Sequence, residues 1–233
     1  MPSDALPFTG FPRDTIDFLA DLGANNTREW FSLNKARYEQ SFLAPSLKFI
    51  AGMEKPLQRV APLLKAEPKK MGGSLMRIYK DTRFSKDKTP YKTNIGIHFR
   101  HQLGKDVHSP GVYLHIAPDG CFMGAGIWRP DSASLSLIRE RILQDEAAWT
   151  RMRRGKRFRE TFEMHDDRLK TAPRGIDRSH PQIEDLRLKS FIAMAPLSRQ
   201  VIQGPEFIKT LTQRVRDAQP LMLFLAEALG HPY

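Results

Sequence analysis

Apolar positions near the N-terminus recur at the three- and four-residue spacing of an amphipathic helix. Phe11, Thr15, Phe18, Leu19 and Leu22 fall on one face at that spacing, so we predict a helix that packs this face against the core. The helical pattern continues to residue 60, which makes the N-terminal third predominantly helical.

The segment "NNTREWF" over residues 25–31 predicts the start of a second helix. Asn26 is a favoured N-cap residue, and Glu29 stands three positions later, as in a capping box. We expect this segment to be architectural, with Trp30 and Phe31 contributing apolar area to the core.

Beyond Leu75 the period changes from helical to alternating, which predicts β-strands. The four expected strands cover residues 75–79, 95–101, 112–117 and 121–128. The tight-turn sequence "PDG" joins the last two strands into a predicted hairpin. A further short strand is expected within residues 189–197.

Helical spacing returns after Pro130, with an interruption near Gly155, and again over residues 205–230. Helices therefore flank a central β-rich block. This order predicts the α+β class, with a central antiparallel sheet of about four to five strands flanked by N-terminal and C-terminal helices. No internal repeat or linker is visible, so residues 1–233 are expected to form a single domain.

Alternation along the first three strands predicts a sheet with one apolar and one polar face. The polar face is expected to carry only Arg, His and Tyr side chains, namely Arg77, Tyr79, His98, Arg100, Tyr113 and His115. A cluster of cations without carboxylates is unfavourable unless an anion neutralises it. We therefore favour a ligand site here over the alternative, the ordinary solvated side of a half-buried antiparallel sheet.

The segment from Arg77 to Lys92 concentrates positive charge. Its cations are Arg77, Lys80, Arg83, Lys86, Lys88 and Lys92, and its acids are Asp81 and Asp87, which gives 6 − 2 = +4. Backbone N–H groups and the hydroxyls of Ser85 and Thr89 complete the parts of an ordered anion-binding loop. The alternative is a loop pinned by Asp–Arg pairs and anchored by buried Phe84 and Tyr91.

The whole chain is also basic, because 37 Lys and Arg residues against 26 Asp and Glu residues give a net charge of +11. This excess favours anionic partners such as a phosphorylated small molecule or nucleic acid. The single cysteine, Cys121, excludes an intrachain disulfide. The first residues do not resemble a secretory signal, and the longest apolar runs are far shorter than a membrane span. A cytoplasmic location without membrane contact is therefore expected.

Two shorter charged stretches are interpreted as surface. Residues 151–160, "RMRRGKRFRE", resemble a solvated helix face, although such runs can also track a nucleic-acid backbone. Residues 164–167, "MHDD", combine a histidine with two acids, but adjacent residues do not face one another on a helix or strand, so we interpret them as a surface turn.

Motifs of several common enzyme classes are missing from the sequence, including the P-loop, the complete dinucleotide fingerprint, the zincin motif and the nucleophile elbow. His98 and His115 could meet on adjacent strands, with Asp81, Asp87 or Asp119 as a further ligand. Two histidines without a metal are the favoured interpretation, and no metal site is predicted.

Several longer motifs resemble a known family. They are "NNTREWF", "RIYKDTRFSKDKTPYKTNIGIHF", "GVYLHI", "GAGIWRP" followed by "LIRERI", and "HPQIEDLRLKSF". Together they resemble DUF2461, a bacterial family of uncharacterised proteins, from Phe8 to Leu229. Where that family is expected to have an arginine, this chain has Lys80, which keeps the charge without the bidentate geometry. The resemblance implies no activity, cofactor or substrate.

Three classes of function stay open. The favoured one is binding of a phosphate-bearing ligand through a basic Arg/Lys/His surface, made of Arg77, Tyr79, Lys80, Arg83, Lys86, Lys88, Lys92, Arg100 and Tyr113. The second is an enzyme acting on a small anionic substrate, with His98, His115 or Asp81 as the candidate acid or base. The third is an interaction protein for an acidic partner, which predicts an exposed apolar patch beside the basic surface.

Overall fold

The N-terminal region is helical, as predicted. The computed structural model describes residues 7–83, 85–103 and 109–233. Its first elements are α1 (Asp14–Ala24), α2 (Arg28–Leu33), α3 (Lys35–Tyr38), the π-helical turn η1 (Glu39–Leu43) and α4 (Ala44–Val60). All five positions of the predicted apolar stripe are buried; four of them are on α1, which confirms that this face packs on the core, and Phe11 precedes the helix.

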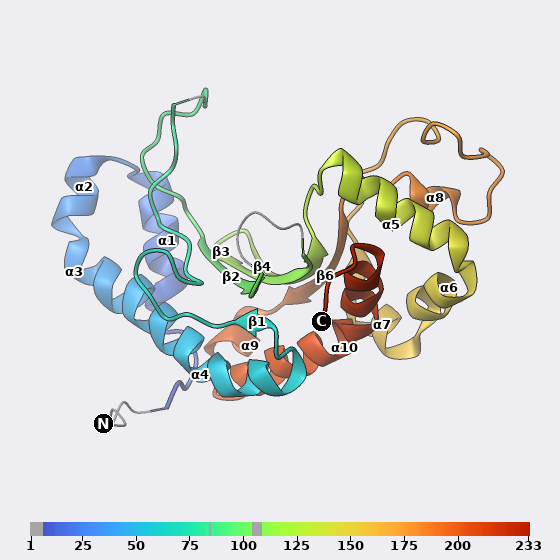
Figure 1. The fold of residues 1–233 in the computed structure, drawn as a ribbon. Helices are drawn as coiled ribbons and strands as arrows, with labels where there is room; N and C mark the ends of the chain where they lie inside the picture. The colour runs from blue at the N-terminus through green and yellow to red at the C-terminus, as the bar shows by residue number, and fades with distance from the viewer. Residues whose placement is uncertain (1–6, 84, 104–108) are drawn as a thin grey trace.

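An antiparallel sheet lies at the centre of the fold (Figure 1). Within the described residues its six strands are β1 (Leu64–Lys65), β2 (Ile95–His101), β3 (Gly111–Ala117), β4 (Gly120–Ile127), β5 (Glu163–Met164) and β6 (Phe191–Leu197). They are arranged in the order β1-β2-β3-β4-β6-β5. The predicted α+β class is confirmed, and β3 and β4 form the predicted hairpin. The two strands that the sequence does not predict, β1 and β5, are two-residue strands at the sheet edges.

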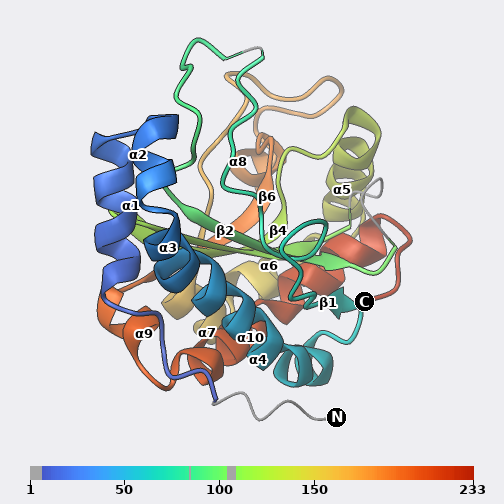
Figure 2. The same ribbon diagram turned by 90° about the vertical axis from the view of Figure 1, so that its left-hand side faces the viewer.

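The remaining helices surround the sheet unevenly. They are α5 (Ser132–Gln144), α6 (Glu146–Arg154), α7 (Lys156–Thr161), α8 (Ile183–Leu186), α9 (Arg199–Gln203) and α10 (Phe207–Ala228). α4 and α10 contact each other and lie against one face of the sheet (Figures 1 and 2). The other face is flanked by α2 on one side and by α5 and α8 on the other (Figure 1). Of the described helices, none combines the length and the apolar composition that a bilayer crossing requires.

The alternation predicted for β2 and β3 is confirmed. Their apolar side chains, Ile95, Ile97, Phe99, Val112, Leu114 and Ile116, are fully buried against the helices. In the antiparallel register His98 lies opposite Tyr113, and Gly96 lies opposite His115. The intervening polar side chains therefore point to the face that α4 and α10 leave uncovered.

The predicted strand over residues 75–79 is wrong, because an irregular segment takes its place. Leu75 makes an isolated bridge to Ile97, and Tyr79 makes another to Tyr91. Between these bridges the chain leaves the edge of β2 and runs outward before it returns. The side chains of this segment are consequently not sorted by a pleat, so a period of two no longer decides which way each one points.

The predicted N-cap of α2 is also wrong. Thr27 caps this helix, since its side-chain oxygen accepts a hydrogen bond from the Trp30 N–H at 3.2 Å. Asn26 instead bonds to the backbone of Tyr91, accepting from its N–H at 3.1 Å and donating to its carbonyl at 3.0 Å. The Tyr91 ring stacks on buried Phe31 at a centroid distance of 4.1 Å. The start of α2 therefore holds the returning end of the 77–92 segment in place.

Candidate ligand-binding site

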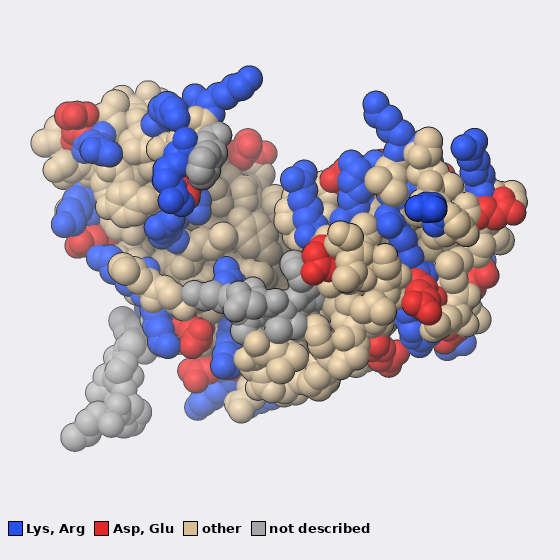
Figure 3. Space-filling model, turned by 45° about the horizontal axis from the view of Figure 1, so that its top comes forward, with Lys and Arg blue, Asp and Glu red and all other residues tan. Residues whose placement is uncertain are grey.

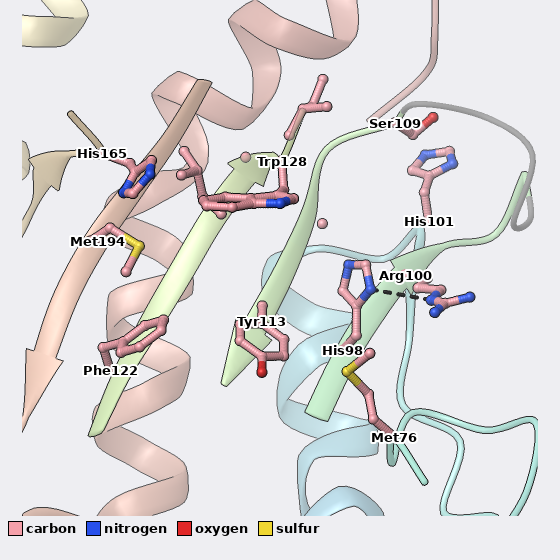
Figure 4. Close-up of a pocket in the computed structure, with 14 residues that line it drawn as sticks. Met76, His98, Arg100, His101, Ser109, Tyr113, Phe122, Trp128, His165 and Met194 are labelled. Atoms are coloured by element: carbon pink, nitrogen blue, oxygen red, sulfur yellow. Dashed lines mark hydrogen bonds between the residues drawn. The ribbon is translucent and has the colours of Figure 1, made fainter. Parts of the chain in front are cut away.

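The uncovered face of the sheet forms the floor of a cavity of about 810 Å³. Figure 3 shows the molecule hollowed between two raised regions, both of which carry Lys and Arg side chains. Much of the cavity lining is apolar, with contributions from Met76, Phe122, Ile127, Trp128, Ile192 and Met194. Met76 comes from the irregular segment beside β2, and the other five come from β4, β6 and the residue directly after β4 (Figure 4). The cavity therefore offers a large apolar surface in a chain that is otherwise highly charged.

Glycines in the sheet beneath this cavity leave room for the side chains that line it. At Gly111 a Cβ atom would lie 2.7 Å from Nε2 of His98, and at Gly96 a Cβ atom would lie 3.0 Å from Sδ of Met76. Gly126 has a φ of +130°, and a Cβ atom there would lie 2.0 Å from the Phe191 carbonyl oxygen. A larger residue at Gly111 or Gly96 would displace the His98 or Met76 side chain, and one at Gly126 would collide with the backbone of β6.

His98 and Arg100 form a polar pair at one side of the cavity (Figure 4). Nε of Arg100 donates a hydrogen bond to Nδ1 of His98 at 3.2 Å. Because Nδ1 accepts this bond, the proton of the neutral ring is on Nε2. Burial, together with the positive charge of Arg100, lowers the pKa of His98 to about 4. His98 is therefore a neutral hydrogen-bond donor near pH 7.

Both residues of this pair have side-chain N–H groups that form no hydrogen bond within the described part of the chain. Among the residues that the structure describes, Arg100 forms no ion pair and Nε2 of His98 has no hydrogen-bond partner. Arg100 is half-buried, so water compensates its charge less completely than it would at the surface. A guanidinium with free N–H groups beside an imidazole N–H is a suitable arrangement for holding a carboxylate or phosphate.

Trp128 and His165 line the other side of the cavity. Their ring centroids are 4.8 Å apart, and 53% of the Trp128 surface is exposed. The Arg129 guanidinium carbon lies 5.7 Å from the Trp128 ring centroid, which is within the range of a cation–π contact. The interpretation of residues 164–167 as a surface turn is therefore wrong for His165, although Asp167 does pair with a surface lysine, Lys189, at 2.7 Å.

Tyr113 and His115 belong to the same face but differ in position. Tyr113 lines the cavity, whereas His115 is outside the lining and stacks on Phe122 at 4.6 Å. The Tyr113 hydroxyl lies 3.3 Å from Nδ1 of His115, and Nδ2 of Asn94 lies 3.4 Å from the same nitrogen. Burial lowers the pKa of His115. His115 therefore packs beside Phe122 and Tyr113, outside the cavity lining.

Both acids of the 77–92 segment are paired with cations of the same segment. Lys80 bonds to Asp87 at 2.6 Å, and Arg83 bonds to Asp81 at 2.7 Å. Hydrogen bonds to Lys80 and Thr89 lower the pKa of Asp87. These contacts match the alternative of a pinned loop, and Tyr91 is its buried anchor. The other expected anchor, Phe84, lies outside the described residues.

The remaining cations of this segment are Arg77, Lys86, Lys88 and Lys92. Lys88 donates to the Thr82 carbonyl, whereas the other three have no ion-pair partner among the described residues. Burial and the charge of Arg77 lower the pKa of half-buried Lys92. None of these residues lines the cavity, and neither do Tyr79, Lys80, Asp81 and Arg83. Anion binding by the segment itself stays a prediction.

The predicted site residues therefore separate into two groups. His98, Arg100 and Tyr113 meet in the cavity, while the residues of the 77–92 segment lie outside it. Sequence reasoning missed Trp128 and His165, together with the apolar lining. In the described part of the chain, no three His, Cys, Asp or Glu side chains are grouped so that they could hold a metal ion.

Comparison with known proteins identifies a family without a described activity. The family model DUF2461, described as a conserved hypothetical protein, matches residues 14–224. The match covers most of the chain, so the protein belongs to this family and the resemblance of its motifs is confirmed. Searches among curated proteins and among solved structures gave no match.

Proposed function

We propose that this protein binds a small organic anion, with a phosphate as the favoured anionic group, in the cavity on the uncovered face of the sheet. The observation that supports this most directly is the His98–Arg100 pair, which presents unused donors at the margin of an apolar cavity. The volume of about 810 Å³ is within the range of about 300–1,000 Å³ that small-molecule sites occupy.

The two halves of the cavity would hold different parts of the ligand. The anionic group would accept hydrogen bonds from Arg100 and from Nε2–H of His98, which are stronger than neutral hydrogen bonds because one partner is charged. A flat apolar body would pack against Phe122 and the exposed ring of Trp128. The segment with three cations outside ion pairs lies next to Met76 in the chain, and it would favour phosphate over less charged groups.

The alternative of an enzyme with His98 as acid or base has weaker support. A pKa of about 4 leaves His98 unprotonated near pH 7, so it carries no acidic proton of suitable strength. Its basic nitrogen, Nδ1, already accepts a hydrogen bond from Arg100. The geometry favours His98 as a hydrogen-bond donor to a bound ligand.

Phenyl phosphate is a suitable first probe, with inorganic phosphate and benzyl alcohol as the two half-ligands. We expect phenyl phosphate to raise the melting temperature more than either half-ligand and to quench the fluorescence of Trp128. Replacing Arg100 by Gln removes a charged hydrogen bond worth about 1.5–3 kcal/mol, so affinity should fall by about 10- to 100-fold. Arg59→Gln on α4, where the side chain is exposed, is the matched control and should leave affinity unchanged.

Two results would contradict the proposal. One is equal stabilisation by phenyl phosphate and inorganic phosphate, because the apolar half of the cavity would then contribute nothing. The other is an equal loss of affinity in Arg100→Gln and Arg59→Gln, because binding would then depend on net charge alone. Trp128→Phe should abolish the quenching signal, which confirms that the fluorescence reports this cavity and not Trp30 or Trp149.

A further inference from the structure

A second cavity of about 720 Å³ lies between α6–α7 and α10. Its lining is strongly basic, with five cations (Arg141, Arg151, Lys156, Arg157 and Arg216) and two acids (Asp217 and Glu227), which gives 5 − 2 = +3. Three of these cations belong to the 151–160 stretch that the sequence predicts to be a solvated helix face. They are exposed on α6 and α7, as predicted, and they also line the wall of a groove.

The five cations are not equally engaged. Arg141 bonds to Glu227 at 3.2 Å and lies 5.0 Å from the ring centroid of Phe224, so its position is fixed by its neighbours. Arg151, Arg157 and Arg216 are exposed and form no ion pair with any residue that the structure describes. The groove therefore holds three cations outside ion pairs among the described residues, although Arg216 donates a hydrogen bond to Oε1 of Gln213 at 2.8 Å and Arg151 is near enough to Asp145 to lower the pKa of that carboxyl.

The groove also has an apolar strip. Leu223 is 44% exposed and lies beside Pro220, both on α10. Met152 and Phe224 also line the groove, so an apolar surface lies beside its cations.

We propose that the groove is a docking site for an acidic peptide segment of a partner protein. Carboxylates of the peptide would face Arg151, Arg157 and Arg216, and an apolar side chain would cover Leu223. The phosphate groups of lipids or nucleic acids would match the cations but would leave Leu223 uncovered. Exposed apolar side chains beside a basic surface are a feature expected of an interaction protein.

The test uses a fluorescein-labelled peptide of about ten residues, in which a Leu-Phe pair is flanked on both sides by Glu and Asp. Binding is measured by fluorescence anisotropy with the full-length protein. We expect Arg157→Glu/Arg216→Glu to weaken binding at least tenfold, because truncation or reversal of close charge pairs costs on the order of 1.5 kcal/mol or more. The matched control is Lys55→Glu/Arg59→Glu, which makes the same change in net charge on exposed positions of α4 and should change affinity less than twofold.

A second pair of variants tests the apolar contact at Leu223. Leu223→Gln should weaken binding at least threefold, whereas Leu137→Gln, a similarly exposed leucine on α5, should not. Equal loss in the two charge-reversal variants would show non-specific attraction and overturn the proposal. So would tight binding of oligo(dT) or of vesicles containing phosphatidylserine through Arg157 and Arg216 without binding of the peptide. None of these residues lines the sheet-face cavity, so phenyl phosphate binding should be the same in all four variants.

Discussion

The hydrogen bond from Arg100 to His98 predicts a specific dependence of stability on pH. The pKa of His98 is about 4 in the folded protein, against an ordinary value of 6.5. As the pH falls below 6.5 the unfolded chain takes up a proton at this position before the folded chain does. The contribution of neutral His98 to the free energy of unfolding is therefore fully present above pH 6.5, and it is lost progressively as the pH falls towards 4. The difference of 6.5 − 4 = 2.5 pH units corresponds to about 3 kcal/mol.

His98→Gln isolates this effect, because glutamine stays neutral across the whole range. Urea unfolding of both proteins at pH 7 and pH 4.5 gives their difference in free energy of unfolding. Between pH 7 and pH 4.5 we expect the wild type to lose about 2–3 kcal/mol more of its free energy of unfolding than His98→Gln loses. Other groups, including His101 and His115, whose pKa values burial also lowers, are present in both proteins and cancel.

A direct measurement is the ¹⁵N NMR spectrum of the histidine rings. The structure requires a neutral His98 with its proton on Nε2 at pH 7. A His98 that titrates near pH 6.5, or one that carries its proton on Nδ1, would refute both the pH argument and its proposed contact with an anion. Saturating phenyl phosphate should raise the pKa of His98, because an adjacent anion favours the protonated ring.

Two further substitutions test the geometry around the cavity. Asn26→Ala removes both bonds to the Tyr91 backbone and should lower the free energy of unfolding, measured in urea, by about 1–3 kcal/mol. Thr27→Ala removes only the helix cap and should cost less, about 1 kcal/mol. Equal costs in the two variants would contradict this prediction. Gly111→Ala should displace the His98 ring, alter its ¹⁵N shifts and weaken phenyl phosphate binding at least tenfold. Gly120→Ala, where a Cβ atom meets nothing within 4 Å, is its control, and similar behaviour of the two variants would contradict the role of Gly111.

The parts of the fold that the sequence predicts well are those in which a regular backbone sorts the side chains. In β2 and β3 the period of two is unbroken, so every apolar residue is buried and His98, Arg100 and Tyr113 share the other face. The same reasoning fails at residues 75–79, because it assumes a pleated strand where the chain makes only isolated bridges. Met76, assigned to the apolar face, consequently lines the cavity.

Long-range side-chain contacts are the other part that a local pattern does not contain. Asn26 stands where a capping residue would, but its amide pairs with a backbone that is 65 positions away. His165 comes directly after β5, and only the pairing of that two-residue strand with β6 brings it to the cavity. A period along a few residues gives no information about such contacts, because they depend on which distant segments the fold brings together.

Counts of charged residues are a poorer guide to a site than the partners of each charge. The 77–92 segment carries a net charge of +4, yet Lys80 and Arg83 are satisfied by acids within it. Exposed pairs of this kind contribute about 0–1 kcal/mol each, and they leave little electrostatic reason for a ligand to bind them. Arg100 is a single charge in a strand, but it is half-buried, bonded to a neutral histidine and without an ion pair among the described residues. A bound anion would relieve the poor solvation of Arg100 and add charged hydrogen bonds, so we expect an anion to bind Arg100 more tightly than it binds Lys80 or Arg83.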